Sequence, residues 1–497
     1  MQHIAAKIKL ILDSSRLTYV ILGFFVFEAL WVACSAAYPM AFDEDFHLGI
    51  IKLYSHHWLP FLSDNAGSTG EFGAVGRDPS YLYHWLMSYP YRLITAITGS
   101  LTVQVIVLRV INIALFGSGL LLSIRVLKQA GSSRALINGL LALFVLIPIV
   151  PLLAGQINYD NLMMPAVAGL CLLSFSVYQD ARAGRINLKH LVAFACLCML
   201  GALVKYAFLP MAGAATVFLA VVYVRAFYGK GSALKAGLRK SHAALGNGAK
   251  IGLLALLLTS SLLFVQRYGL NLSAYHTPVP DCAAVLTSDD CMSYGPWARN
   301  YHYTHDKAVV SGNPLTYTWT WLQGMHYRLF FMISGPDNQY VNWQPLPFPA
   351  GAAICIALFS IVAGVLYGRR LFSGHPLLVL LCCICLTYVA VLWVDNYTQF
   401  LETGQPVAIN GRYLLLVLLP LGAVFGRGLL LALSITPKVK PWAAAIVLLC
   451  FLQGGGLMSF ILRSDSSWYW KSSQIDALNH SARNVLHPII IEGDKYY

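Results

Sequence analysis

The chain has 497 residues, of which 58% are hydrophobic and only 11% are charged, and its formal net charge is +13. This composition, together with a mean hydropathy of +0.63, lies outside the range of soluble globular domains and predicts a membrane protein. The positive charge does not indicate a nucleic-acid partner, because cytoplasmic loops that face anionic lipid explain it.

Apolar runs long enough to cross a membrane recur along the whole chain. A hydrocarbon core of about 30 Å requires roughly 17–25 residues of helix. The sequence therefore predicts an all-α polytopic membrane protein with about eleven transmembrane helices. We expect the spans at 17–38, 101–124, 135–153, 160–178, 189–204, 206–227, 250–266, 348–367, 376–394, 412–433 and 442–461.

The distribution of basic residues predicts the orientation of the chain. Lys7, Lys9 and Arg16 precede the first span, and further basic residues gather in every second loop, including the stretch 228–249. Because short cytoplasmic loops are enriched in Lys and Arg, we expect the N-terminus in the cytoplasm and the C-terminus outside. Compact loops favour a bacterial inner membrane, with a periplasmic C-terminus. Nearly all acidic residues then lie on the outer side, so we expect carboxylate chemistry there.

No internal repeat divides the chain. Cys282 and Cys291 lie in a polar outer segment, and in an oxidising compartment two such cysteines predict a local disulfide. The outer loops are expected to carry the function. We expect one transmembrane module over 1–461, with outer loops at 39–100, 267–347 and 395–411, followed by an outer tail at 462–497.

The stretch 42–54, FDEDFHLGIIKLY, places three acids directly after the first span. Apolar residues at helical spacing follow Asp43 and stop at Pro60, which predicts a short amphipathic helix on the outer membrane surface. One explanation of the acids is structural: Asp43 caps this helix, and the helix dipole favours Glu44 and Asp45. The other is that carboxylates held at the membrane plane, where desolvation makes charge costly, meet a ligand that comes out of the lipid.

Three further polar elements lie at the outer ends of predicted spans. They are GQINYDNLMMP at 155–165, LVKYAFLP with Lys205, and NGRYLLLVLLP with Arg412. Helix capping by Asn158 or Asp160 explains the first, and snorkelling to the surface explains the two bases. Together, however, two acids and two bases at the ends of four spans suit the anionic headgroup of a lipid. The bases would hold a phosphate, and a carboxylate would take a proton from an acceptor hydroxyl.

These elements resemble the polytopic glycosyltransferases of the GT-C fold, which use polyprenyl-phosphate sugars as donors. The first stretch is similar to that of the protein O-mannosyltransferases, in which Asp-Glu precedes His and Gly; here Asp45 is an additional residue before Phe46 and His47. The similarity extends to the aminoarabinose transferase group. It covers the topology from the first span to the tenth, with outer-face juxtamembrane helices, whereas the second outer loop and the tail match nothing.

The resemblance implies an inverting transfer at the outer face to a glycan, lipid or protein acceptor. Asp43 would be the general base, Glu44 would orient the acceptor, and Lys205 and Arg412 would neutralise the departing phosphate. In some members of the fold a divalent ion bridges two acids, which here would be Asp43 and Asp160 with Mg²⁺ or Mn²⁺. The substrate-binding residues would be His47, Asn158, Tyr159, Asp160, Asn161, Tyr206 and Tyr413.

Two other classes of function remain open. A secondary transporter would carry ionisable groups near mid-membrane and broken helices in matched halves, whereas only Glu28 and Arg109 lie deep in the predicted spans. A lipid-linked glycan ligase or polymerase would also use outer-leaflet polyprenyl carriers, but with Arg and His in place of a leading Asp-Glu pair. An assay of sugar transfer from a polyprenyl-phosphate donor separates the three.

Overall fold

The computed structural model describes residues 2–40, 43–63, 70–306, 312–330, 347–435 and 439–491. These residues form helices joined by short connections, and the β-bridge between Ala36 and Tyr469 is isolated. Among these described residues, nine helical stretches are long and apolar enough to cross a membrane. The chain is therefore a helical polytopic membrane protein. These stretches contain α2 (Ser15–Ser35), α6 (Leu101–Gln129), α9 (Asp160–Arg182), η2 (Tyr206–Phe208) with α11 (Leu209–Phe227), α13 (Asn247–Phe264) with the π-helix η3 (Val265–Gly269) and α14 (Leu270–Tyr275), α19 (Pro347–Phe372), α20 (Pro376–Thr403), η5 (Gly411–Leu414) with α21 (Leu415–Ala432), and α22 (Lys440–Leu452) with α23 (Leu457–Arg463).

Two shorter apolar helices coincide with the two remaining predicted spans, at 135–153 and 189–204. They are α7 (Arg134–Val145) and α10 (Leu188–Val204). The count of eleven spans therefore stays a prediction, while nine is the number supported by length and composition in the described residues. The other helical elements are α1 (Gln2–Leu12), α3 (Glu44–Ser55), η1 (Gly70–Phe72), α5 (Leu82–Ile97), α8 (Ile149–Ala154), α12 (Gly231–Ala243), α15 (Cys282–Val285), α16 (Ser288–Cys291), α17 (Gly295–His305), α18 (Pro314–Phe330), η6 (Leu433–Ile435), η7 (Ser466–Trp468) and α24 (Ser473–Leu486).

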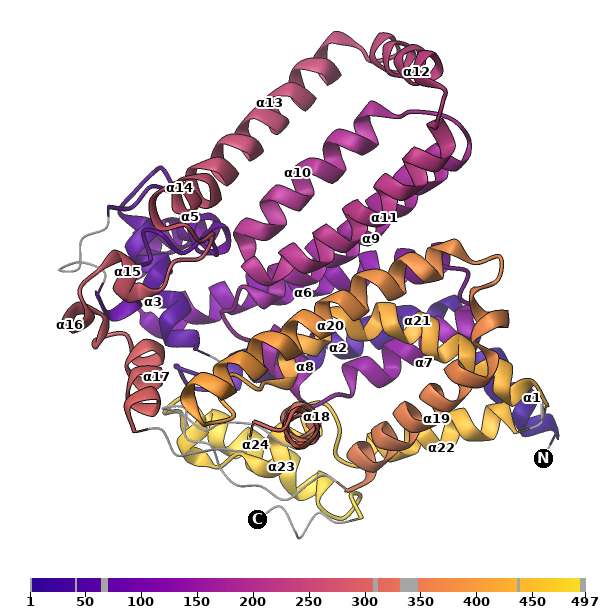
Figure 1. Cartoon of the computed structure of the whole chain (residues 1–497). Helices are drawn as coiled ribbons and strands as arrows, with labels where there is room; N and C mark the ends of the chain where they lie inside the picture. Colours follow the sequence, from indigo (N-terminus) through magenta and orange to yellow (C-terminus); the bar gives the residue numbers. More distant parts are fainter. Residues whose placement is uncertain are drawn as a thin grey trace.

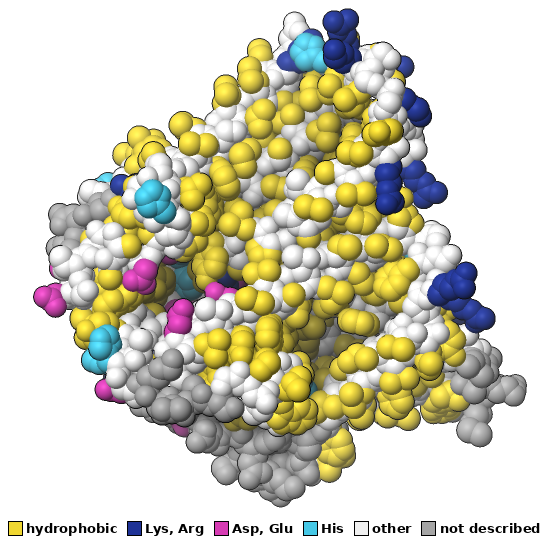
Figure 2. Space-filling view, in the orientation of Figure 1, with side chains coloured by type: hydrophobic (Ala, Val, Ile, Leu, Met, Phe, Trp, Pro, Cys, Tyr) yellow, Lys and Arg dark blue, Asp and Glu magenta, His cyan; other side chains and the backbone are white. Residues whose placement is uncertain are grey.

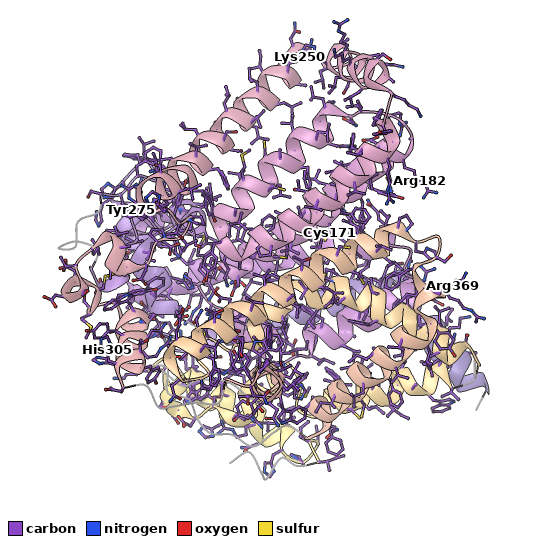
Figure 3. All side chains as sticks on the ribbon, viewed as in Figure 1. Cys171, Arg182, Lys250, Tyr275, His305 and Arg369 are labelled. Carbon is purple, nitrogen blue, oxygen red and sulfur yellow. A yellow bond between two sulfur atoms is a disulfide. The ribbon has the colours of Figure 1, made fainter. Side chains whose placement is uncertain are left out.

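Charge separates the molecule into two ends. Lys and Arg side chains line one edge, and Asp, Glu and several His side chains gather at the opposite side, with a hydrophobic belt between them (Figure 2). We call the edge with Arg182, Lys250 and Arg369 the basic end, and the side with Tyr275 and His305 the acidic end (Figure 3). This asymmetry is the one expected of a protein whose basic loops are retained in the cytoplasm.

The long helices pack closely where small residues allow it. A Cβ atom at Gly119 of α6 would lie 2.5 Å from the Met164 side chain of α9, so these two helices are in close contact. Helices α10 and α13 extend from this central pair as an arm, and α19, α20, α21 and α22 form the other side (Figure 1). Large hydrophobic side chains on α13 and α19 are exposed, as expected for surfaces that face lipid.

Short helices cover the acidic end. The amphipathic helix predicted after Asp43 is α3, which buries Leu48, Ile50 and Tyr54 but ends at Ser55, before Pro60. Figure 1 views α18 almost along its axis while α10, α13 and α20 run across the picture, so α18 crosses the direction of the spans. These elements confirm that helical segments lie outside the membrane-spanning set at this end.

The second outer segment and the tail are tied to this layer. Cys282 and Cys291 form the predicted disulfide. In the tail, α24 packs against α2, where the Trp31 indole donates to Asn479 at 2.9 Å. The tail residue Trp470 also donates its backbone N–H to the Ser35 carbonyl at the end of α2. The tail therefore supports the segment that leads into the acids.

Candidate functional site

Four of the predicted residues lie at points where helices begin or break. Asp43 precedes α3, Asp160 begins α9, Lys205 separates α10 from η2, and Arg412 lies in η5. Local hydrogen bonds explain two of these turns: the Asn158 side chain accepts from the Asp160 N–H at 2.9 Å, and the Asn410 side chain accepts from the Arg412 N–H at 3.1 Å. The Asn158 side chain thus stabilises the turn that leads into α9, whose N-cap residue, Tyr159, makes no capping hydrogen bond with its side chain.

These four residues, hereafter the open cluster, meet at the acidic end. Lys205 Nζ donates to Asp160 Oδ1 at 2.7 Å. Arg412 Nη2 donates to Asp43 Oδ2 at 3.1 Å, and Arg412 Nε lies 3.7 Å from Asp160 Oδ2. The four charges therefore alternate along one chain of contacts, contributed by segments up to 369 residues apart in sequence.

The geometry contradicts three of the structural explanations. Asp43 occupies the N-cap position of α3 with φ of 65°, but its side chain makes no capping hydrogen bond. Lys205 and Arg412 do not snorkel, because they are only 5% and 4% exposed. Burying two cations is costly unless anions are held beside them, and Asp160 and Asp43 fill that role. Asp43 itself remains largely exposed.

Aromatic rings surround the buried cations. The Lys205 ammonium lies 4.4 Å from the Tyr159 ring centroid and 4.5 Å from that of Tyr413. The Arg412 guanidinium lies 5.2 Å from the Tyr413 ring. Tyr206 follows Lys205 directly and is 44% exposed. Cation–π contacts stabilise a desolvated cation without neutralising it, so the bases keep charge available to an anion.

Glu44 lies next to Asp43 but has different surroundings. Its carboxylate forms a bidentate ion pair with Arg109 of α6, at 2.8 and 2.7 Å, and accepts the backbone N–H groups of Met40 and Ile157. Arg109 also donates to the Ala33, Ala36 and Ala37 carbonyls. Both side chains are fully buried. We call Glu44 and Arg109 the closed pair, since its geometry leaves little capacity for a substrate.

The two asparagines beside Asp160 join a network with α6. Asn161 donates to Asn112 Oδ1 at 2.9 Å and to the Gln156 carbonyl, and the Asn158 N–H points at the same Asn112 oxygen at 3.4 Å. The Tyr83 hydroxyl donates to this oxygen as well. These contacts hold the 155–161 turn, so Asn158 and Asn161 act on the open cluster through the placement of Asp160.

His47 forms a buried pair with a residue that the sequence did not single out. His47 Nδ1 lies 2.9 Å from His84 Nε2, the two rings stack, and the His47 ring meets the edge of Tyr159. Burial lowers the pKa of His84 to about 3, and burial with neighbouring His84, Arg412 and Lys205 lowers that of His47. Both imidazoles are therefore neutral near pH 7. His84 lies within LYHWL in α5, a stretch without any motif.

The donor set does not fit the divalent ion that the resemblance allowed. The Arg412 guanidinium contacts both Asp43 and Asp160, and Lys205 occupies the other Asp160 oxygen. His47, the histidine that follows these acids in the sequence, is paired with His84. Within the described ranges no three His, Cys, Asp or Glu side chains form a group that could hold a metal. Lys205 and Arg412 thus occupy the positions beside Asp43 and Asp160 that a divalent ion would need.

The surface opens at this end. Figure 2 shows a hollow within the hydrophobic face, toward the acidic end, in which Asp or Glu and His atoms are visible between hydrophobic ones. A separate cavity of about 470 Å³ lies near the basic end and is lined by Arg182 and His375 among others. It shares no residue with the open cluster, so it does not bear on this site.

No protein-family model, curated protein or solved structure matches the chain. The resemblance to GT-C glycosyltransferases consequently rests on the motifs alone, and the chemistry of the site must carry any assignment of function.

Proposed function

We propose that the protein is a GT-C-like glycosyltransferase that moves a sugar from a polyprenyl-phosphate donor to an acceptor hydroxyl at the outer, periplasmic face of a bacterial inner membrane. The observation that carries the proposal is the open cluster: two buried cations and a largely exposed carboxylate, joined by contacts, at the acidic end of a membrane-spanning bundle. Phosphate binding needs the cations, and proton removal needs the carboxylate.

The donor phosphate is assigned to Lys205 and Arg412. A hollow in the hydrophobic face leads toward the acidic end, which gives a lipid phosphate a route to these cations (Figure 2). Within the described residues, the Lys205 ammonium makes one hydrogen bond, to Asp160, and otherwise faces the rings of Tyr159 and Tyr413. Its ammonium has three donors, so a phosphate oxygen can be added without breaking the pair.

The general base is assigned to Asp43. Oδ2 accepts from Arg412, whereas Oδ1 makes no hydrogen bond within the described part of the chain, and the side chain is 55% exposed. The acceptor oxygen attacks the anomeric carbon, the bond from that carbon to the phosphate oxygen breaks, and the acceptor proton passes to Asp43. The phosphate leaves as an anion beside Lys205 and Arg412. Glu44 is reassigned from orienting the acceptor to positioning this segment through Arg109.

The surroundings of the charged residues argue against the transporter alternative. Arg109 is used in full by Glu44 and three carbonyls, and Glu28 accepts the Leu457 N–H at the start of α23. Neither lies in the open cluster. A ligase or polymerase acting on polyprenyl carriers remains the second candidate, because it would use the same two bases for the carrier phosphate.

The test is sugar transfer by the purified protein in lipid nanodiscs. Polyprenyl-phosphate-linked mannose, glucose and aminoarabinose are supplied with alkyl glycoside and threonine-peptide acceptors, and release of polyprenyl phosphate is followed. We expect release from at least one donor, lowered about 10²-fold to 10⁴-fold by Asp43→Asn, the range for loss of a general base.

The matched control is Asp45→Asn, because Asp45 is exposed and its side chain makes no hydrogen bond or ion pair within the described residues. This variant should keep nearly full activity. If polyprenyl-phosphate release survives Asp43→Asn but is lost in Asp45→Asn, the general base is Asp45 and not Asp43. If the wild-type protein releases polyprenyl phosphate from none of the donors, the glycosyltransferase assignment is wrong.

A further inference from the structure

Tyr294 lies three residues after Cys291 and reaches the site from the second outer segment. Its ring stacks on Phe46 of α3, with centroids 5.8 Å apart and an angle of 28° between planes. Gly73, with φ of +67°, lies against the other part of the ring, where a Cβ atom would come within 2.7 Å of Tyr294 Cδ1. Phe46 and Gly73 thus form a slot that fits this ring.

The slot holds Tyr294 near acidic side chains. Asp43 and Asp78 lie within electrostatic range of its hydroxyl: burial raises the pKa of Tyr294, and these two carboxylates raise it further. The hydroxyl therefore stays protonated and able to donate. Within the described residues it makes no hydrogen bond, and Phe46 precedes His47, one turn of helix after Asp43. Within the described residues, Tyr294 consequently offers an unpaired donor in electrostatic range of Asp43.

The disulfide determines how Tyr294 is presented. Residues 281–294 contain only the one-turn helices α15 and α16, capped by Asp281 and Thr287. Such short elements bury too little apolar surface to hold a fixed position alone. The Cys282–Cys291 bond closes this segment three residues before Tyr294, and α16 contacts η1, which in turn contacts α3.

We propose that Tyr294 is an acceptor-binding residue, held in place by the Cys282–Cys291 disulfide, and that the acceptor it fits is the hydroxyl of a glycan. This inference rests on the proposed function and adds the acceptor class to it. The acceptor side of the site consists of the Phe46 and Tyr294 rings, a phenol donor and the Asp43 carboxylate, a mixture of apolar faces and polar groups. In the described residues no strand edge is present that could pair with an extended peptide acceptor.

The first experiment measures the acceptor KM of Tyr294→Phe with an alkyl glycoside in the nanodisc assay. This change keeps the ring in its slot and removes only the hydroxyl, so folding is retained. We expect the KM for the glycoside to rise about threefold to tenfold, as loss of one neutral hydrogen bond predicts, while the affinity for polyprenyl phosphate stays unchanged. Tyr301→Phe in α17 is the matched control, since its ring packs on Trp297 and His305 away from the slot.

The second experiment replaces both cysteines by serine. We expect the same rise in KM or a larger one, because Tyr294 is then no longer held, again with unchanged binding of polyprenyl phosphate. Unaltered KM in both variants overturns the inference, and so does transfer to the threonine peptide in preference to the glycoside. These outcomes require a wild-type protein that releases polyprenyl phosphate, so they are distinct from failure of the proposed function, in which the wild type releases none.

Discussion

The open cluster and the closed pair place neighbouring acids, Asp43 and Glu44, in opposite environments. Each acid meets a buried arginine. Glu44 is fully buried and accepts two bonds from Arg109 and two from backbone N–H groups. Asp43 is 55% exposed and accepts one bond from Arg412. These two neighbouring carboxylates therefore differ in how much of their hydrogen-bonding capacity the protein itself uses.

The comparison shows how one end of a bundle separates scaffold from site. A buried polar network whose groups are all paired rigidifies a fold, whereas one that leaves groups unpaired retains capacity for a ligand. In the open cluster Asp160 Oδ2 is buried and accepts no hydrogen bond from the described residues, although Arg412 lies 3.7 Å away. The closed pair ties the end of α2 and the start of α3 to α6. Asp43 of the open cluster directly precedes this pair's Glu44.

The largest expected effect is on stability and tests the closed pair. Glu44→Gln leaves the Arg109 charge buried without its counterion, which should lower the free energy of unfolding by about 3–5 kcal/mol. The measurement is a denaturation series of the purified protein in mixed micelles. Asp45→Asn, one residue away and exposed, should change stability by no more than about 0.5 kcal/mol. Equal stability of the two variants would remove the distinction between scaffold and site.

The next effect is on ligand binding and tests the open cluster. Lys205→Ala and Arg412→Ala each remove a charge-assisted contact worth roughly 1.5–3 kcal/mol, so the affinity for polyprenyl phosphate should fall about tenfold to a hundredfold. Binding can be followed by native mass spectrometry of the nanodisc complex. Lys250→Ala at the basic end is the control and should bind as the wild type does. Undiminished binding in both cluster variants would contradict the phosphate assignment.

Much of this arrangement was predictable because it depends on local patterns. Apolar length fixed the helical membrane class, and the spacing of Phe46, Ile50 and Tyr54 indicated α3. The residues of the open cluster were predictable for a different reason, because charged residues at the ends of apolar runs are easily recognised in a sequence that is mostly hydrophobic. The disulfide followed from two cysteines in a polar segment, as the bond between Cys282 and Cys291 confirms.

The partners of these residues were not predictable, because they depend on packing between distant segments. Arg109 lies in the middle of an apolar helix, 65 residues from Glu44, and no local pattern connects the two. His84 and Tyr294 carry no motif and gain their positions from the stacking of α5 and the disulfide segment on α3. The sequence therefore identified the charged residues, but it did not show that Glu44 is already paired with a buried partner, Arg109.

A smaller effect concerns pH and the histidines beside the open cluster. The pKa of His84 is about 3 in the folded protein, against a value of 6.5 for a free side chain. Between these values the unfolded chain binds a proton that the folded protein does not, so the stability is fully present above pH 6.5 and is lost as the pH falls toward 3. At pH 5 the loss from His84 should be about 2 kcal/mol.

The groups that face this pair make the sign of the effect robust. His47 and His84 face each other and the rings of Tyr83 and Tyr159, and the charges of Arg412 and Lys205 further oppose protonation of His47. His84→Gln should therefore flatten the decline in the free energy of unfolding between pH 7 and pH 5, whereas the exposed His57→Gln should leave it as in the wild type. A decline of equal slope in all three proteins would mean that the histidine pair is already charged or hydrated in the native state, and the two imidazoles would then not be the neutral neighbours of Arg412 and Lys205.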